Sequence, residues 1–192
     1  MGTSVIGAIV VGAVVVLLVI IVVSLYNGLV RKRIDCENGW AQIDVQLKRR
    51  YDLIPNLVET VKGYAGHERE TLERVIAART RAVDASKSAG VGERGQAEGE
   101  LTAALGRLFA VAEAYPDLKA NQNFSQLQEE LTSTENKIGF SRQHYNDCVA
   151  RYDNARQAFP SNIIAGMFNF TRREYFEILE PTAREAPKVS FS

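Results

Sequence analysis

Hydrophobic positions follow three successive patterns along the chain. The first is an unbroken apolar run, VIGAIVVGAVVVLLVIIVVSL, which occupies residues 5–25 and contains no charge and no proline. A helix rises about 1.5 Å per residue, so this run would span roughly 30 Å, the thickness of the hydrocarbon core of a bilayer. A secretory signal peptide would carry a basic start and a small-residue cleavage site, and this run has neither. We predict a transmembrane helix over residues 5–25, preceded by a short extracytoplasmic N-terminus at residues 1–4.

The second pattern is the three-and-four spacing of an amphipathic helix, which begins after the apolar run. It leads from Trp40 to Ala65 through Ile43, Leu47, Tyr51, Ile54, Val58 and Val61. Pro55 lies inside this stripe, and we expect a kink or a brief break there because proline removes one backbone donor. The glycines at positions 63 and 66 are expected to end the helix.

Two shorter helices are predicted next, with a glycine-rich stretch between them. The first runs from about His67 to Lys87 and the second from about Gln96 to Ala114. Their inward positions are expected to be Leu72, Val75, Ile76 and Val83 in the first, and Leu101, Leu105, Leu108, Phe109 and Ala112 in the second. The stretch SAGVGERG at residues 88–95 is interpreted as a turn, because it lacks the residue order of a phosphate-binding loop.

The third pattern is a heptad repeat, and it is the clearest of the three. Residues recur at alternating steps of three and four, as in helices that pack along a coiled-coil seam: Phe124, Leu127, Leu131, Thr134, Ile138, Ser141, Tyr145, Cys148, Tyr152, Ala155 and Phe159. Asn123, followed three residues later by Gln126, resembles a capping box at the start, and Pro160 ends the helix. The repeat predicts one long helix over residues 124–159.

Together these patterns predict an all-α fold. It consists of an N-terminal transmembrane helix that continues into an elongated antiparallel four-helix bundle at residues 26–180, with a loose tail at residues 181–192. Residues 26–63 and 124–159 would form helices of about 57 and 54 Å, whereas the two others would each measure about 30 Å. The membrane-proximal half would then hold only two helices, and its apolar residues would need cover from the C-terminal segment or from a second copy.

The segment that follows the heptads is apolar and ends in two arginines. It reads PSNIIAGMFNF at residues 160–170, and Arg172 and Arg173 come after it. Two interpretations stay open: insertion into the membrane interface, or folding back over the end of the bundle. The residues singled out for contact between copies or for membrane-proximal contact are Tyr145, Tyr152, Phe159, Ile163, Ile164, Met167 and Phe168.

The charged residues mainly predict the orientation of the chain in the membrane. The formal net charge is +0, with 23 Lys and Arg against 23 Asp and Glu, which argues against a nucleic-acid binder. Arg31, Lys32 and Arg33 follow the apolar run and no basic side chain precedes it, so the positive-inside rule places the N-terminus outside and the C-terminus in the cytoplasm. The later run KRR at residues 48–50 is expected to face solvent or the acidic groups of a partner.

No residue pattern of an enzyme or of a cofactor site appears. Cys36 and Cys148 lack zinc-site spacing and are interpreted as reduced thiols, and His67 and His144 have no metal-ligand partners at a suitable spacing. The motifs GxSxG, SxxK and HExxH are absent from the sequence. We therefore expect no catalytic residue, metal, cofactor or small-molecule substrate.

Several longer motifs resemble those of one bacterial family. They are WAQIDVQLKRRYDLIPNLVETVKGY at residues 40–64, YPDLKAN at 115–121, LQEEL at 127–131, ENKI at 135–138 and FPSNIIA at 159–165, with the pair YN at 26–27 and again at 145–146. They extend from residue 26 to about residue 176 and are similar to the LemA family. The resemblance implies a bacterial cytoplasmic-membrane protein with an anchor and a helical bundle, and it implies no reaction.

Two functions are compatible with these features, and both are non-enzymatic. The first is a membrane-tethered helical scaffold that self-associates and organises or shapes the cytoplasmic membrane, with the bilayer and further copies as partners. The alternative is a membrane-anchored adaptor that presents the distal end of its bundle to a cytosolic protein. The residues singled out at that end are Tyr64, His67, Tyr115 and Asp117.

Overall fold

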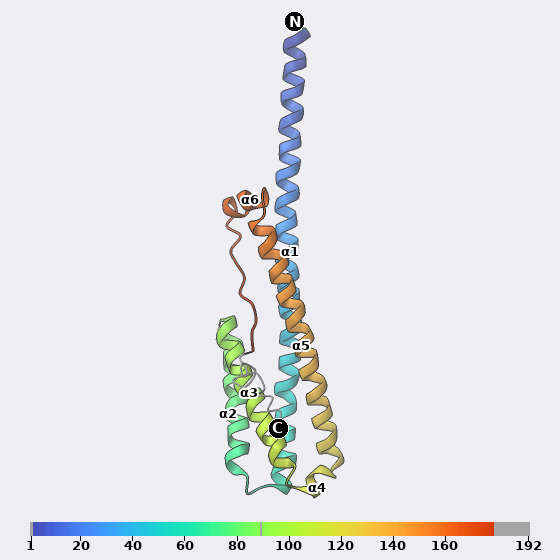
Figure 1. Ribbon diagram of the computed structural model, residues 1–192, viewed down its shortest axis with the longest axis vertical. Coiled ribbons are helices and arrows are strands. Elements are labelled where there is room, and N and C mark those ends of the chain that lie inside the picture. Colours follow the sequence, from blue (N-terminus) through green and yellow to red (C-terminus); the bar gives the residue numbers. More distant parts are fainter. Residues whose placement is uncertain (1, 89, 179–192) are drawn as a thin grey trace, which may run out of the picture. The chain divides into compact units, whose positions relative to one another are not determined.

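The computed structural model describes residues 2–88 and 90–178 (Figure 1). Every regular element in these residues is a helix: α1 (Gly2–Tyr64), α2 (Arg69–Ser88), α3 (Val91–Ala112), α4 (Pro116–Lys119), α5 (Gln122–Gln157) and α6 (Ser161–Met167). The all-α class is thus confirmed for the part of the chain that is described. The tail predicted at residues 181–192 lies outside the described residues.

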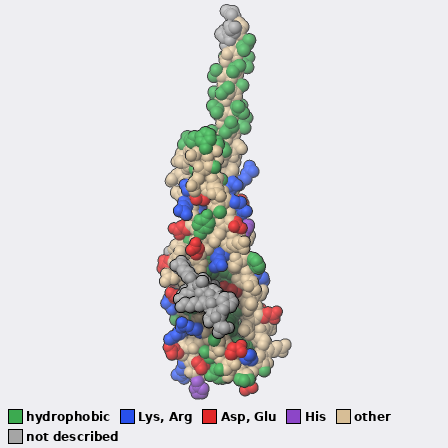
Figure 2. Space-filling model, viewed as in Figure 1, with side chains coloured by type: hydrophobic (Ala, Val, Ile, Leu, Met, Phe, Trp, Pro, Cys, Tyr) green, Lys and Arg blue, Asp and Glu red, His purple; other side chains and the backbone are tan. Residues whose placement is uncertain are grey.

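Helix α1 is a continuous helix of 63 residues that contains the whole apolar run. From Ile6 to Val23 its large apolar side chains are 39–66% exposed, and Figure 2 shows them on the surface along the N-terminal part of the helix. By length and composition, α1 is able to cross a membrane. It therefore agrees with the predicted N-terminal apolar helix.

A kink or a brief break was expected at Pro55. No break interrupts α1 there. Proline lacks the N–H that would have bonded to the carbonyl of Tyr51, four residues earlier. The Arg79 side chain supplies a donor instead, because its Nε donates to the Tyr51 carbonyl oxygen at 2.7 Å. A side chain from α2 thus satisfies the backbone acceptor that Pro55 leaves free, and the helix continues.

The chain divides into two compact units, and α1 and α5 each contribute to both. Unit 1 comprises Met1–Gly39 and His144–Arg173, and so holds the N-terminal part of α1, the end of α5 and α6. Unit 2 comprises Trp40–Gln143 and Glu174–Ser192, and so holds the rest of α1 and α5 together with α2, α3 and α4.

The core of unit 1 lies between α1 and the end of α5. A Cβ added at Gly39 would lie 3.3 Å from the Cα of Tyr145, so glycine allows the two helix backbones to approach closely. The side chains buried in this unit include Leu29, Cys36, Tyr145, Cys148, Val149 and Tyr152. Three of them are positions of the predicted heptad repeat.

The core of unit 2 is formed by the amphipathic stripes of its helices. Helices α2 and α3 lie side by side (Figure 1). The buried apolar side chains include Ile43, Leu47, Ile54, Leu57, Val61, Leu72, Val75, Leu101, Leu105, Leu108, Leu118, Leu131 and Ile138. The inward assignment of Ile76 is wrong, because its side chain is 50% exposed. The stripe of α2 steps by three and four from Val75 to Ala78 and Ala82, which leaves Ile76 outside it.

Two predicted helix boundaries are also wrong. Helix α3 begins at Val91, so most of the glycine-rich stretch is helical rather than a turn. Helix α5 begins at Gln122, and its cap is Asn121 rather than Asn123, because the Phe124 N–H bonds to the Asn121 side-chain oxygen at 3.0 Å. At the start of α5 the cap is a local bond that the sequence also offered two residues earlier than predicted.

Candidate functional site

The membrane-proximal part of the candidate site lies in unit 1. Tyr26 directly follows the predicted span, and Arg31 and Arg33 are exposed one to two helical turns further along α1, whereas Lys32 is half-buried. The Arg33 guanidinium lies 5.4 Å from the centroid of the Phe170 ring, within cation–π range. These basic residues therefore stand at the end of the apolar segment, where lipid headgroups would be met.

Helix α6 and the turn before it present large apolar side chains to solvent. Ile164 and Ala165 are buried, which fixes one face of this seven-residue helix against unit 1. Four exposed side chains on α6 and directly beside it are named here the apolar corner: Phe159 (80% exposed), Ile163 (52%), Met167 (72%) and Phe168 (51%). Figure 2 shows hydrophobic side chains gathered over α6.

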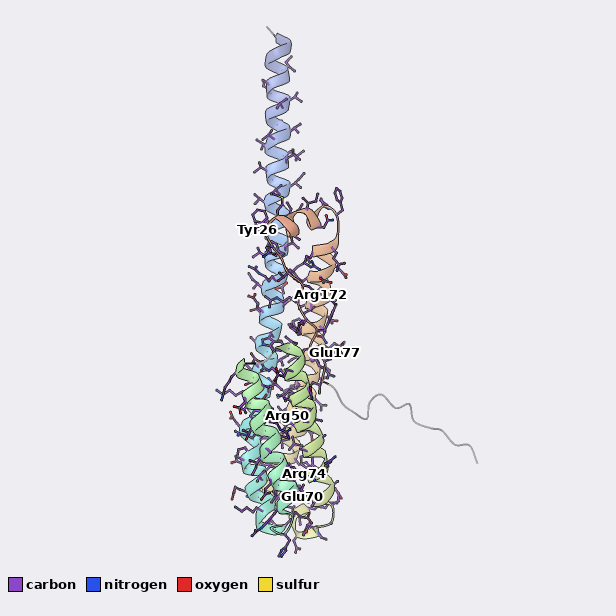
Figure 3. The ribbon with its side chains drawn as sticks, turned by 90° about the vertical axis from the view of Figure 1, so that its left-hand side faces the viewer. Tyr26, Arg50, Glu70, Arg74, Arg172 and Glu177 are labelled. Carbon is purple, nitrogen blue, oxygen red and sulfur yellow. The ribbon has the colours of Figure 1, made fainter. Side chains whose placement is uncertain are left out.

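The chain reverses after α6 and packs on α1. Asn169 adopts a left-handed φ of 54°, which asparagine tolerates better than most residues, and the Phe170 N–H bonds to the Ala165 carbonyl at 2.9 Å. The rings of Phe168 and Phe170 then lie 4.9 and 5.6 Å from the Tyr26 ring in edge-to-face geometry. Figure 3 shows Tyr26 beside α6.

Further contacts hold the segment that follows Phe170. The hydroxyl of Tyr152, which is 1% exposed, donates to the Thr171 carbonyl at 3.0 Å, and Arg173 forms an ion pair with Glu37. Burial raises the pKa of Tyr152, so this hydroxyl remains a donor. The C-terminal segment thus folds back on unit 1 and supplies cover for the end of α5.

The seven residues singled out for membrane-proximal or intermolecular contact fall into two groups. Tyr145, Tyr152 and Ile164 are buried within the chain itself and leave no surface for a second molecule. The other four form the apolar corner. Sequence reasoning did not separate these groups, because the turn between α5 and α6 decides which side of the segment faces inward.

Both cysteines lie in unit 1 and are free thiols. Cys36 is 0% exposed and Cys148 is 2% exposed. Burial raises the pKa of Cys36, and the neighbouring Cys148 raises it further. A thiol that is buried and protonated is a poor nucleophile, so Cys36 acts as a small core residue.

Unit 2 contains a buried charge cluster that sequence reasoning missed. Arg50 (Figure 3) is only 2% exposed, and its Nη2 donates to the Thr102 hydroxyl at 2.7 Å. Its Nη1 lies 3.1 Å from Glu135 Oε2 and 3.5 Å from Glu98 Oε2. The Tyr51 hydroxyl donates to the other oxygen of Glu98. For Arg50, the expectation of solvent or of a partner's acids is wrong, because the acids come from α3 and α5 of the same chain.

Protonation in this cluster follows from burial. Burial raises the pKa of Glu98, and the Tyr51 hydrogen bond and the charges of Arg50 and Arg94 oppose the rise. Burial and the adjacent Glu98 also raise the pKa of Tyr51, which therefore stays a neutral donor. Glu98 is 0% exposed, so a substrate could not reach its carboxyl group. The arrangement joins α1, α3 and α5 and is unsuited to catalysis.

A second contact network in unit 2 ends in residues 174–178, named here the C-terminal strap. Phe176 is 0% exposed and meets the Trp40 ring at 5.3 Å between centroids. Arg94 lies 4.9 Å from the centroid of the Trp40 ring and is paired with Asp44. Figure 3 places Glu177 beside the helices of this unit. The strap is thus fixed by an aromatic side chain inserted beside Trp40.

A signal for the charged residues was present in the sequence. In α3 the apolar stripe at Leu101 and Leu105 extends backwards by three and four residues to Glu98 and Arg94. Charges at core positions of a helix indicate buried pairs, since an unpaired buried charge is strongly destabilising. The stripe alone does not name their partners, which come from α1 and α5.

The residues singled out at the distal end lie around two turns of unit 2. Tyr64 is 45% exposed, and its hydroxyl accepts a hydrogen bond from the Asn121 side chain at 2.8 Å. The Tyr115 hydroxyl donates to Glu68 at 3.1 Å. His67 and Asp117 are exposed. These bonds join the α1–α2 turn to the segments on either side of α4 and hold both tyrosines in place.

Metal ligation has no support in the described part of the chain. Among residues 2–88 and 90–178, no group of three or more His, Cys, Asp and Glu side chains could hold a metal ion.

Comparison with known proteins gives consistent matches. The sequence profile of the LemA family matches residues 39–191. The chain is 26% identical to magnetosome protein MamQ 2 of Paramagnetospirillum magneticum, over 86% of this chain and 68% of that protein. It is 25% identical to magnetosome protein MamQ of Magnetospirillum gryphiswaldense with the same coverage. It is 24% identical to protein LemA of Metamycoplasma hominis, over 83% of this chain and 72% of that protein.

Proposed function

The chain belongs to the LemA family, and we propose that it is a membrane-tethered, non-enzymatic helical scaffold that self-associates and organises or shapes the bacterial cytoplasmic membrane. The observation that carries this proposal is the surface of α1, whose large side chains from Ile6 to Val23 are apolar and exposed. Such a surface is stable in lipid and unstable in water. In this proposal the segments of α1, α2, α3 and α5 that belong to unit 2 form the four-helix bundle of the scaffold.

Self-association is assigned to the membrane-spanning part of α1. The heptad residues Tyr145 and Tyr152 are buried inside unit 1 and do not provide an interface. Within the span, Ala8 and Gly12 are four residues apart on one face, and a Cβ added at Gly12 would meet nothing within 4 Å. Small residues at this spacing let two transmembrane helices approach closely.

Replacing Gly12 by isoleucine tests this assignment. The added side chain separates the helices, so the dissociation constant of the oligomer is expected to rise about tenfold, which corresponds to about 1.4 kcal/mol. Ala13→Ile adds similar bulk on another face of the helix and is expected to leave association unchanged. Mass photometry of the full-length chain in mild detergent measures both. A wild-type chain that is monomeric at micromolar concentration would refute self-association.

Orientation is a separate prediction, based on the basic residues Arg31, Lys32 and Arg33 after the span. The N-terminus is expected outside, because basic residues near a span remain in the cytoplasm. A Ser4→Cys variant in intact cells is expected to react with a membrane-impermeant maleimide. Buried Cys36 and Cys148 keep the background low. Labelling only after the cells are opened would reverse the assigned orientation.

The distal end supports a second candidate function, that of an adaptor for a cytosolic protein. Tyr64 is exposed yet held by Asn121, and Tyr115 is held by Glu68, so part of this surface is ordered before any partner arrives. Preorganised aromatic side chains are favourable binding residues. Crosslinking in cells from Asp117→Cys separates the two functions: adducts to a different protein favour the adaptor, and adducts between copies favour the scaffold.

A further inference from the structure

We propose that the apolar corner is a second membrane contact, which inserts into the cytoplasmic interface of the bilayer beside the transmembrane helix. The corner consists of Ile163 and Met167 on α6, Phe168 at its C-cap and Phe159 in the turn before it. This inference rests on the proposed membrane anchoring by α1, and it adds a lipid contact made by residues far from the span in sequence.

The depth of the corner follows from its contact with Tyr26. Tyr26 is the first residue after the predicted span, so it marks the boundary between hydrocarbon and headgroups. The Phe168 ring lies 4.9 Å from the Tyr26 ring, and both residues belong to unit 1. With residues 5–25 in the bilayer, Phe168 is therefore held at the same boundary.

The side chains of α6 also favour a lipid neighbour. Its inner face is already filled, because Ile164 and Ala165 are buried in unit 1. Ile163 and Met167, four residues apart in α6, remain exposed, as do Phe168 at its C-cap and Phe159 before it. A short helix that is apolar on both faces is stable only where both are covered. Full burial of side chains of this size is worth about 1.5–3 kcal/mol each.

Basic side chains stand where anionic headgroups would meet them. Arg31 and Arg33 are exposed on α1 beyond Tyr26. Arg172 is exposed after α6, and Figure 3 shows it on the side of α6 away from the apolar end of α1. Apolar residues thus lie toward the hydrocarbon and arginines toward the headgroup layer, the order found in interfacial amphipathic segments.

The size of the corner favours lipid over a second copy as its occupant. A stable protein interface buries about 800 Å² on each partner and involves about 20–30 residues a side. The corner offers four large apolar side chains, which is too few for such an interface. For an interfacial lipid contact that number is sufficient, because the span already supplies the anchoring.

The test uses the full-length chain in phosphatidylcholine–phosphatidylglycerol vesicles containing lipids with a nitroxide near the headgroup end of the acyl chain. A polarity-sensitive nitrobenzoxadiazole dye is attached to Met167→Cys, while the native cysteines are buried. Phe140→Cys is the matched control, since Phe140 is 73% exposed and Met167 is 72% exposed. Val23→Cys reports on the span, because Val23 is exposed and lies three residues before Tyr26. The dye at position 167 is expected to emit at shorter wavelength and to be quenched severalfold more than at position 140.

Each other outcome overturns the inference in a recognisable way. Quenching at position 23 without quenching at position 167 rejects the corner contact and leaves the proposed membrane anchor intact. Failure of quenching at both positions rejects the anchor itself. A blue-shifted but unquenched dye at position 167, together with crosslinks between copies from Met167→Cys, would show that a second copy covers the corner.

Discussion

Replacing Arg50 by methionine is expected to destabilise unit 2 by about 3–5 kcal/mol, because the change leaves the fully buried Glu98 carboxylate without its cationic partner. Methionine retains most of the aliphatic volume of the arginine stem, so the loss reports on charge rather than on packing. Guanidinium denaturation of the full-length chain in detergent, followed by the fluorescence of Trp40, measures the change in free energy of unfolding.

The cost of Arg50→Met should also depend on pH. Burial raises the pKa of Glu98 in the folded chain, so at pH values between the unfolded and the folded pKa the folded state holds a proton that the unfolded state has lost. Stability contributed by Glu98 is therefore lost as pH rises above its unfolded pKa of about 4.3. Arg50 lowers the folded pKa, and its removal raises that pKa further. The variant is expected to be more strongly destabilised at about pH 8 than at about pH 5.

Two further variants distinguish this explanation from a general loss of stability. Arg49→Ala removes the neighbouring arginine, which is 54% exposed and lies 3.7 Å from Glu130, and it should cost less than about 1 kcal/mol. The double change Arg50→Met with Glu98→Met removes both buried charges and should recover much of the loss. Equal destabilisation by the single and the double variant would contradict the role assigned to the ion pair.

The helices themselves were predictable from the sequence because their apolar spacing is regular. The run at residues 5–25, the stripe from Trp40 to Ala65 and the heptads after Phe124 each carry a strong periodic signal. The helix is not broken at Pro55, although the sequence allowed for a break there, because a donor from Arg79 in another helix replaces the missing N–H. A local rule about proline contains no information on such a distant side chain.

The candidate site was predictable only in outline. The sequence indicated an apolar C-terminal segment near the membrane, and Phe159, Ile163, Met167 and Phe168 are indeed exposed. It left open whether the C-terminal segment or a second copy would cover Tyr152, because the answer depends on the reversal at Asn169 and the bond to Thr171. Pairings between distant segments of this kind are set by tertiary structure.

The role of the glycine-rich stretch at residues 88–95 was also not predictable from the sequence. Glycine at position 95 was interpreted as a sign of a turn, whereas its role is to permit a close approach inside a helix. A Cβ at this position would lie 2.0 Å from the Glu177 carbonyl oxygen and 3.7 Å from the Phe176 ring. The absence of a side chain therefore creates the surface on which the C-terminal strap lies.

Replacing Gly95 by alanine is consequently expected to displace the C-terminal strap while the helices stay folded. Phe176 would leave its place beside Trp40, with a loss of about 1.5–3 kcal/mol for the exposed ring. Since Trp40 is the only tryptophan, its emission should shift to longer wavelength. Trypsin should also cleave faster after Arg173, which immediately precedes the strap.

Gly106→Ala provides the matched control for this prediction, because Gly106 lies in the same helix and a Cβ there would meet nothing within 4 Å. This change should stabilise the chain by about 0.5–1 kcal/mol through helix propensity alone and leave the Trp40 emission unchanged. The same propensity gain acts at position 95, so any net loss there measures the clash with the strap. If Gly95→Ala behaved like Gly106→Ala in both emission and proteolysis, the strap would not be held against α3 in solution, and the burial of Phe176 would not contribute to stability.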